Sequence, residues 1–165
     1  MQQNRSDVAL VTKAAAITTP THGGRAKCLQ RLVRLDLPIP RTVALSFEMV
    51  HKLASGELSD ISDILSTFEE EDLLCVRPSS ESPDWGGPGA VLNVGMNDEN
   101  YRKLSSSLGE RAAAKIYFRF VQGYSVHVAR LDPEIFDHIE GQGKSALDEA
   151  LTAYEDETEG PFPQE

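Results

Sequence analysis

One stretch constrains the fold more than any other, because two apolar segments flank a loop of serine, proline and glycine: LLCVRPSSESPDWGGPGAVLNVG, residues 73–95. The apolar segments 73–76 and 91–94 have the length and the side chains of buried strands. Arg77 follows the first segment directly, and an arginine that leaves a buried strand needs an acceptor for its charge. The stretch therefore predicts two strands of one sheet, joined by a loop with a cation at its mouth.

The loop itself can bind an anion. Its glycines, Gly86, Gly87 and Gly89, permit the close approach that lets backbone N–H groups point at one spot, whereas Pro88 has no N–H to offer. From the glycines alone, a plain surface connection between the strands is the more common arrangement. Arg77 adds a planar fork that matches a phosphate group. With 26 acidic residues in the chain, a structural ion pair of Arg77 is the competing interpretation.

A second candidate anion site is the sequence THGGRAK, residues 21–27. Two glycines precede an amphipathic helix that we expect over residues 25–35, with Arg25 and Lys27 in its first turn. A helix start attracts anions through free N–H groups and the helix dipole, whereas basic side chains there are unfavourable for the helix. A ligand charge would explain them, and an exposed basic helix face is the alternative. The spacing is not that of a P-loop.

The remaining pattern predicts an α/β chain with a boundary near residue 97. Residues 8–18 fit a strand, although their alanines leave a helix open, and Ser46 fits an N-cap. The other expected elements are a strand at 42–45 and helices at 47–54, 59–68, 98–124, 131–139 and 145–157. The fold class is therefore α/β, in an α+β arrangement, with a small α/β lobe at 1–97 and a helical subdomain at 98–165.

Composition excludes several classes of partner. The formal net charge of −10 argues against a nucleic-acid backbone as ligand. No apolar run approaches the ~20 residues of a membrane span, and the first residues lack a signal pattern, so we expect a cytoplasmic protein without a membrane partner. Cys28 and Cys75 lie in apolar surroundings and are expected to be reduced core thiols. The histidines lack metal-ligand spacing, so we expect no metal site in this chain. We assign no catalytic residue to it.

Four blocks, in this order, resemble the start of the pyruvate phosphate dikinase family. They are GGRAKCLQRLVRLDLPIPRTVALSFEMV, LLCVRPSSESPDWGGPGAVLNVGMND, RAAAKIYFRFVQGYSVHV and GPFPQE. The related phosphoenolpyruvate synthases share the first two blocks more loosely. The resemblance runs from about residue 23 to the end of the sequence. Its most specific part is VLNVGMND together with Arg77 at a fixed distance upstream.

The resemblance implies the first lobe of an ATP-grasp nucleotide-binding domain, with ATP and Mg²⁺ as cofactors. It implies contacts to the ATP phosphates from five residues: Arg25, Arg77, Gly86, Gly87 and Gly89. In that family the magnesium ligands, the phosphohistidine domain and the pyruvate site follow the segment that this chain resembles. The implied function is the ATP-binding N-terminal segment of a phosphotransferase that forms phosphoenolpyruvate from ATP, pyruvate and phosphate through a phosphohistidine. The segment alone is expected to be inactive.

Two departures from the family pattern lead to an alternative function. Arg25 stands at the lysine position, and residues 87–90 are Gly, Pro, Gly and Ala where the family usually has two methionines, Asp and Thr. The lost carboxylate and hydroxyl would lower a phosphoryl-transfer rate more than they would alter the fold. The alternative is thus a non-catalytic regulatory or interaction module built on this lobe, and a purely structural domain is a third. The expected partners are the nucleotide and the missing second lobe and phosphohistidine domain, and a homodimer is left open.

Overall fold

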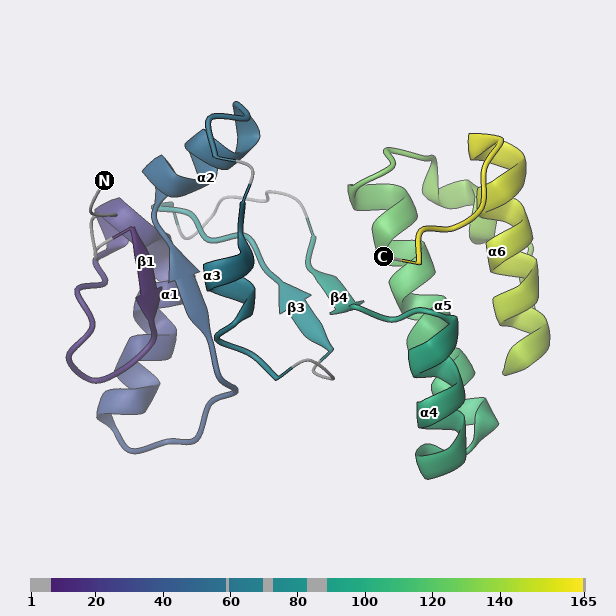
Figure 1. Ribbon diagram of the computed structural model, residues 1–165, viewed down its shortest axis with the longest axis horizontal. Coiled ribbons are helices and arrows are strands. Elements are labelled where there is room, and N and C mark those ends of the chain that lie inside the picture. The colour runs from purple at the N-terminus through teal and green to yellow at the C-terminus, as the bar shows by residue number, and fades with distance from the viewer. Residues whose placement is uncertain (1–6, 59, 70–72, 83–88, 165) are drawn as a thin grey trace. The chain divides into compact units, whose positions relative to one another are not determined.

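The computed structural model describes residues 7–58, 60–69, 73–82 and 89–164, and the chain forms two compact units (Figure 1). We call residues 1–70 with 78–87 the N-terminal unit, and residues 71–77 with 88–165 the helical unit. Each unit contains helices and a two-stranded antiparallel sheet, so the mixed α/β class predicted from the sequence is confirmed. The predicted domains 1–97 and 98–165 stay a prediction.

The N-terminal unit is built on strands β1 (Val8–Leu10) and β2 (Val43–Leu45), with helix α1 (Thr19–Arg34) between them in sequence. The strands pair with Val8 opposite Leu45 and Leu10 opposite Val43. Small and branched side chains from both strands and from α1 form the core of this unit: Ala9, Val11, Ile17, Ala26 and Ala44. A first helical turn begins at Thr19, with Pro20 at a position that needs no N–H partner. After a kink at Gly23 the helix resumes close to the start predicted at residue 25.

Helix α2 (Phe47–Ala54) follows the sequence prediction, and α3 (Ser62–Leu65) does not. Ser46 caps α2 as predicted, because its hydroxyl accepts a hydrogen bond of 3.1 Å from the Met49 N–H. The helix predicted over residues 59–68 is wrong in extent, since only one turn forms. Asp60 accepts hydrogen bonds from both the N–H and the hydroxyl of Ser62, a local turn that competes with a longer helix.

Strands β3 (Leu74–Val76) and β4 (Val91–Val94) pair antiparallel, which confirms the two predicted strands of one sheet. Leu74 lies opposite Val94 and Val76 lies opposite Val91, with a bulge between these pairs. Asn93 sits at the irregularity with a left-handed φ of 60°, which asparagine tolerates better than most residues. Its side-chain amide donates a hydrogen bond of 3.2 Å to the Ile116 carbonyl and so fixes β4 against the neighbouring helix.

The rest of the helical unit contains α4 (Asp98–Leu108), α5 (Glu110–His127), the 3₁₀ helix η1 (Pro133–Phe136) and α6 (Lys144–Thr158). The helical pattern expected over residues 98–124 is confirmed as two helices, since Gly109 with a φ of 88° breaks it. The helix expected over residues 131–139 is only a single 3₁₀ turn. Asp132 caps that turn, because its side chain accepts a hydrogen bond of 2.9 Å from the Glu134 N–H. A loop that contains Gly143, with a positive φ of 73°, follows.

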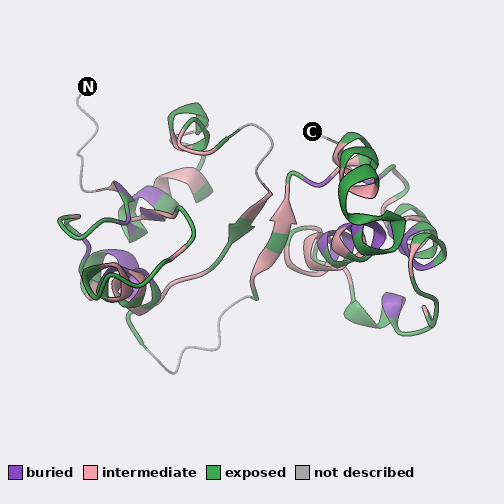
Figure 2. Cartoon of the chain, turned by 90° about the horizontal axis from the view of Figure 1, so that it is seen from below, coloured by how far each residue is buried: buried purple, intermediate pink, exposed green. Residues whose placement is uncertain are grey.

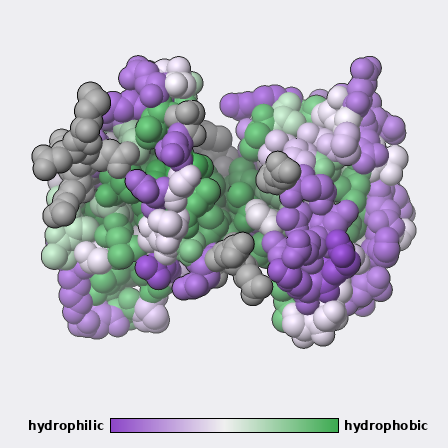
Figure 3. Space-filling model, viewed as in Figure 1, coloured by the Kyte–Doolittle hydropathy of each residue, from purple (hydrophilic) through white to green (hydrophobic). Residues whose placement is uncertain are grey.

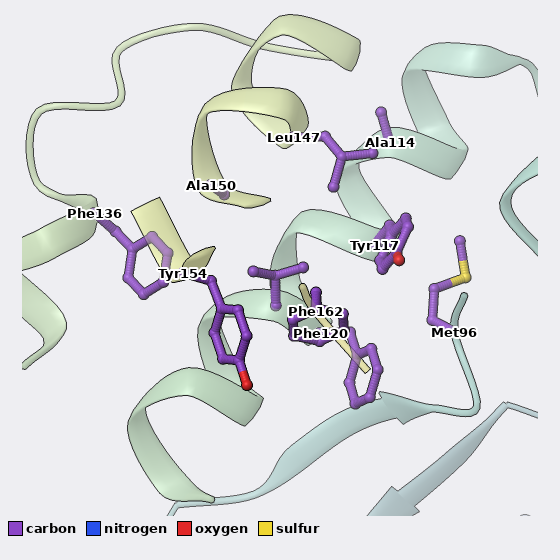
Figure 4. Close-up of a cluster of buried hydrophobic side chains, with 10 residues drawn as sticks. Met96, Ala114, Tyr117, Phe120, Phe136, Leu147, Ala150, Tyr154 and Phe162 are labelled. Carbon is purple, nitrogen blue, oxygen red and sulfur yellow. The ribbon is translucent and has the colours of Figure 1, made fainter. Parts of the chain in front are cut away.

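The core of the helical unit is a cluster of aromatic rings around Phe162 (Figure 4). Phe162 lies in the turn-like segment after α6 and is 3% exposed. Its ring meets those of Tyr154 and Phe120 edge-on, with centroids 5.1 Å and 5.5 Å away. Figure 2 shows the buried residues of α5 gathered on the side that faces the other helices of this unit. The segment after α6 is therefore part of the core and not a loose tail.

The surface of the two units differs in hydropathy. On the face shown in Figure 3, hydrophobic side chains are mixed into the surface of the N-terminal unit, whereas hydrophilic side chains predominate on the helical unit. Cys28 and Cys75 are free thiols with exposed side chains, so the expectation of core thiols is wrong. Cys75 follows half-buried Leu74 along β3, and successive side chains of a strand point to opposite faces. Within the described residues, no helix is both long enough and apolar enough to cross a membrane.

Candidate functional site

The start of α1 is shaped by Gly23, which interrupts the helix with φ 80° and ψ 168°. This backbone conformation is essentially restricted to glycine. A Cβ atom on Gly23 would collide with the Ser79 side chain and would lie 2.7 Å from the Ser80 nitrogen. Glycine is required here both for its conformation and for the close approach of the segment that follows β3. The paired glycines of the sequence THGGRAK thus have a structural role.

The N–H groups at this helix start are in contact with the chain's own residues. The Gly24 N–H donates to the Ser80 carbonyl at 2.6 Å, and the Ala26 N–H donates to the Ser79 hydroxyl at 3.3 Å. Ser79 and Ser80 therefore act as a cap supplied from a distant part of the sequence. An anion at this helix start has to join or displace that cap.

The two cations predicted at the helix start have different environments. Arg25 is exposed, and its guanidinium donates a hydrogen bond to the Pro78 carbonyl. Its remaining N–H donors leave it able to bind a phosphate as well. Lys27 instead donates to the Ile17 carbonyl at 2.7 Å and to the Gln30 side chain at 2.8 Å. The Lys27 ammonium thus ties α1 to the preceding loop, a role that sequence reasoning did not identify.

Arg77 extends from the end of β3 into solvent. It is exposed, and it makes no hydrogen bond or ion pair with any residue that the structure describes. The carboxylate partner that the sequence left open for Arg77 is therefore not found within residues 7–58, 60–69, 73–82 and 89–164. An arginine in this state retains all five N–H donors for a ligand.

Gly89 lies in the helical unit, close to the side chain of His127 at the end of α5. A Cβ atom on Gly89 would lie 2.5 Å from His127 Nε2 and 2.8 Å from Cε1, so the imidazole occupies the space of a side chain at this position. His127 was not predicted as a site residue, because nothing in the local pattern of α5 indicates a contact with residue 89. The other two predicted glycines, Gly86 and Gly87, lie outside the described residues.

The predicted site residues are thus distributed over both units. Arg25 belongs to the N-terminal unit, whereas Arg77 and Gly89 belong to the helical unit. Within the helical unit, Arg77 follows Val76 directly, and Val76 pairs with Val91, two residues after Gly89. Arg77 and Gly89 therefore lie just past the same end of the β3–β4 ladder. We call Arg77, Gly89 and His127 the β3–β4 mouth.

His22 is a buried polar residue beside the glycine pair. Its side chain is 1% exposed, and its Nδ1 lies 2.8 Å from the Thr21 hydroxyl. Its Nε2 has no hydrogen-bond partner among the described residues. A histidine buried in this way offers no exposed group to a ligand.

A surface depression of about 710 Å³ lies between η1 and α6, and its charge argues against a phosphate ligand. Its lining includes four carboxylates, those of Asp148, Glu149, Asp156 and Glu157. Lys144 is the ammonium in this lining, and its hydrogen bond with Asp148 at 2.9 Å raises the Lys144 pKa above its ordinary value. The excess of negative charge would repel a polyphosphate, so the depression is not the nucleotide site.

Three residues of the block VLNVGMND, the most specific part of the family resemblance, have structural roles in the fold. Asn93 occupies the strand irregularity, and Met96 is 1% exposed in the core. Asn97 caps α4, because its side chain accepts a hydrogen bond of 2.9 Å from the Asn100 N–H. These residues set the geometry of β4 and α4. Their presence therefore supports a similar fold more directly than it supports a similar reaction.

Comparison with known proteins agrees with this distant likeness. No protein-family model matches the chain. The chain is similar to the pyruvate, phosphate dikinase of Rhizobium meliloti (strain 1021), with 26% identity over 144 residues that cover 76% of this chain. The match covers 16% of that relative, so the chain spans a small part of the relative's length. The match supports a distant relationship to this dikinase.

Proposed function

We propose that this chain forms one wall of an ATP-binding cleft in a pyruvate phosphate dikinase-like phosphotransferase. The observation that supports the proposal most directly is that Arg77 is exposed and unpaired among the described residues. This residue ends a paired strand, is exposed, and has no partner among the described residues, next to a loop whose glycines permit close backbone approach. The distant match to a dikinase supports the same assignment.

In the proposed site, Arg77 is the first contact to the ATP phosphates. A planar guanidinium can bind two phosphate oxygens and neutralise the charge that they carry during phosphoryl transfer. Arg25 is the second contact, through the N–H donors that its bond to the Pro78 carbonyl leaves free. The amides of Gly86, Gly87 and Gly89 complete the proposed phosphate contacts, and the first two of these glycines lie outside the described residues.

Magnesium enters the proposal through residues outside this chain. The described residues contain no group of three or more His, Cys, Asp and Glu side chains that could hold a metal ion. Bound magnesium would neutralise charge on the phosphates of ATP. We assign its ligands, the phosphate-accepting histidine and the pyruvate site to the rest of a longer protein. In that protein the phosphoryl group passes from ATP to the histidine and then to pyruvate.

A second candidate function is a non-catalytic regulatory or interaction module. The observation that favours it is the helix start of α1, where the chain's own Ser79 and Ser80 bind the amides and Arg25 bonds to Pro78. In such a module, the chain's own serines occupy the amides that would otherwise bind an anion. The fold is then stable without a nucleotide. The loss of the family's carboxylate and hydroxyl in the loop points the same way.

An assay of phosphoenolpyruvate formation tests the leading proposal. The full-length protein should form phosphoenolpyruvate from ATP, phosphate and pyruvate in the presence of magnesium, whereas the 165-residue chain alone should not. Robust magnesium-dependent turnover by the 165-residue chain would contradict the proposal that this chain supplies only one wall of the ATP-binding cleft. A full-length protein that lacks turnover and fails to bind ATP would favour the non-catalytic module.

A further inference from the structure

We propose that His127 is a further phosphate-binding residue, which contacts the polyphosphate chain of ATP at the β3–β4 mouth. The inference rests on the proposed function and adds a residue that neither the sequence pattern nor the family resemblance assigns. It follows from the position of the imidazole, from its lack of other partners and from the rigidity of the helix that carries it.

The first observation is the direction of the imidazole. Of the His127 atoms, Nε2 is the one nearest to the Cβ position of Gly89, at 2.5 Å, followed by Cε1 at 2.8 Å. The nitrogen-bearing edge of the ring therefore faces the backbone of the segment that leads into β4.

The second observation is that this nitrogen is available. His127 is half-buried, and it makes no hydrogen bond or ion pair with any residue in the described ranges. It is the last residue of α5. An N–H at Nε2 would therefore be a donor without a competitor among these residues.

The third observation is that Arg77 and Gly89, the residue that His127 contacts, lie past the same end of the β3–β4 ladder. Arg77 follows the Val76–Val91 pair on one strand, and Gly89 precedes it on the other. In the proposed arrangement, a phosphate bound by Arg77 lies at the end of the ladder where the His127 imidazole contacts residue 89. Two donors of different shape can then contact successive phosphate groups of a polyphosphate.

The fourth observation is that the backbone beneath His127 is fixed. Ser125 is fully buried, and its hydroxyl donates to the Val121 carbonyl at 2.6 Å. The Leu131 N–H donates to the Ser125 carbonyl at 3.0 Å, which holds the chain after the helix against α5. A donor on such a support loses little freedom when it binds a ligand.

Calorimetric titration of ATP, and separately of inorganic pyrophosphate, into the full-length protein tests the inference. His127→Ala should weaken both affinities by about two- to tenfold, the range of one hydrogen bond. His127→Gln keeps an N–H donor at a similar reach and should stay within about twofold of the wild type. His138→Ala is the matched control, because this exposed histidine lies in the acidic depression and should change neither affinity.

The outcomes separate the inference from the proposed function. If the wild type binds ATP and Arg77→Ala weakens binding, but His127→Ala matches the wild type, His127 is a packing residue and the inference is wrong. If the wild type binds neither ATP nor pyrophosphate, the proposed function and the inference both fail. A loss with ATP but not with pyrophosphate would place His127 on the nucleoside and would also contradict the inference.

A double-mutant comparison checks the contact itself. Gly89→Ala should weaken ATP binding in the wild-type background, because the new methyl group displaces the imidazole. The same change should have little effect in the His127→Ala background, where the space is empty. Equal effects of Gly89→Ala in both backgrounds would show that His127 and residue 89 act independently, and would contradict the inference.

Discussion

The side-chain amide of Gln164 donates a hydrogen bond of 3.0 Å to the phenol of Tyr117, which joins the segment after α6 to the middle of α5. The same amide group accepts a hydrogen bond of 2.9 Å from the Asp98 N–H through its oxygen. The backbone carbonyl of Gln164 accepts a further hydrogen bond of 3.1 Å from the Asn97 side-chain amide. One glutamine thus accepts from a free N–H group in the first turn of α4. Its side-chain amide also donates a hydrogen bond of 3.2 Å to the Phe162 carbonyl, beside the aromatic core.

Gln164→Ala should therefore destabilise the helical unit. The change removes the acceptor of the Asp98 N–H and the donor to the Tyr117 phenol, which keeps its own hydrogen bond of 3.2 Å to the Asp98 carboxylate. We expect a loss of about 0.5–1.5 kcal/mol in the free energy of unfolding. Urea denaturation followed by circular dichroism measures it. Gln142→Ala is the control, because this exposed side chain bonds only to Arg111 among the described residues and should cost less than about 0.5 kcal/mol. Equal costs for the two variants would contradict the anchoring role of Gln164.

Tyr117 should give the protein a stability loss at high pH. Burial, together with the nearby carboxylate of Asp98, raises the pKa of Tyr117 to about 12, above the ordinary value of 10.0. The folded state therefore holds the phenolic proton more tightly than the unfolded state. This contribution is fully present below pH 10 and is lost as the pH rises through 12.

Unfolding of the wild type and of Tyr117→Phe between pH 9 and pH 12 would test this prediction. The wild type should lose stability over the window, and the Phe variant, which has no phenol, should lose less. Tyr124→Phe, which alters a half-buried tyrosine of the same helix, is the control for general alkaline effects. Parallel curves for the wild type and Tyr117→Phe would exclude a raised pKa of Tyr117.

Gly23→Ala should destabilise the N-terminal unit more than other glycine substitutions do. Its backbone conformation costs an alanine about 1–3 kcal/mol, and the collision with Ser79 and Ser80 adds to that cost. Gly56→Ala is the matched control, because Gly56 also has a positive φ of 75° but no atom within 4 Å of its Cβ position. Thermal unfolding of both variants compares them. A smaller loss at Gly23 than at Gly56 would show that the Ser79–Ser80 cap moves away without cost.

The sequence predicted the elements whose stability is local. The flanking apolar runs gave β3 and β4, and Ser46 gave the start of α2, because branched side chains and caps act within a few residues. The helix near residue 62 is shorter than its pattern indicated. Ile61 and Leu65 are exposed, so this segment buries no apolar face that would extend the helix.

The candidate site was less predictable because it depends on contacts between distant residues. The cap of α1 comes from Ser79 and Ser80, more than fifty positions away, and no local pattern indicates it. The contact of Gly89 with His127 is of the same kind. Arg77 was predictable as a residue of interest, because a cation directly after an apolar strand is conspicuous in any sequence. Its lack of a partner could be seen only in the fold.

The most direct test of the account is one comparison of ATP affinity and melting temperature in the full-length protein, before and after Arg77→Ala. If Arg77 contacts a phosphate, Arg77→Ala should weaken the affinity ten- to hundredfold, the equivalent of about 1.5–3 kcal/mol for a charge-assisted contact, with little change in melting temperature. Arg119→Ala, at an exposed arginine of α5, is the control and should change neither quantity. Unchanged affinity together with a large loss of stability, about 3–5 kcal/mol as for a broken buried ion pair, would contradict the phosphate role of Arg77.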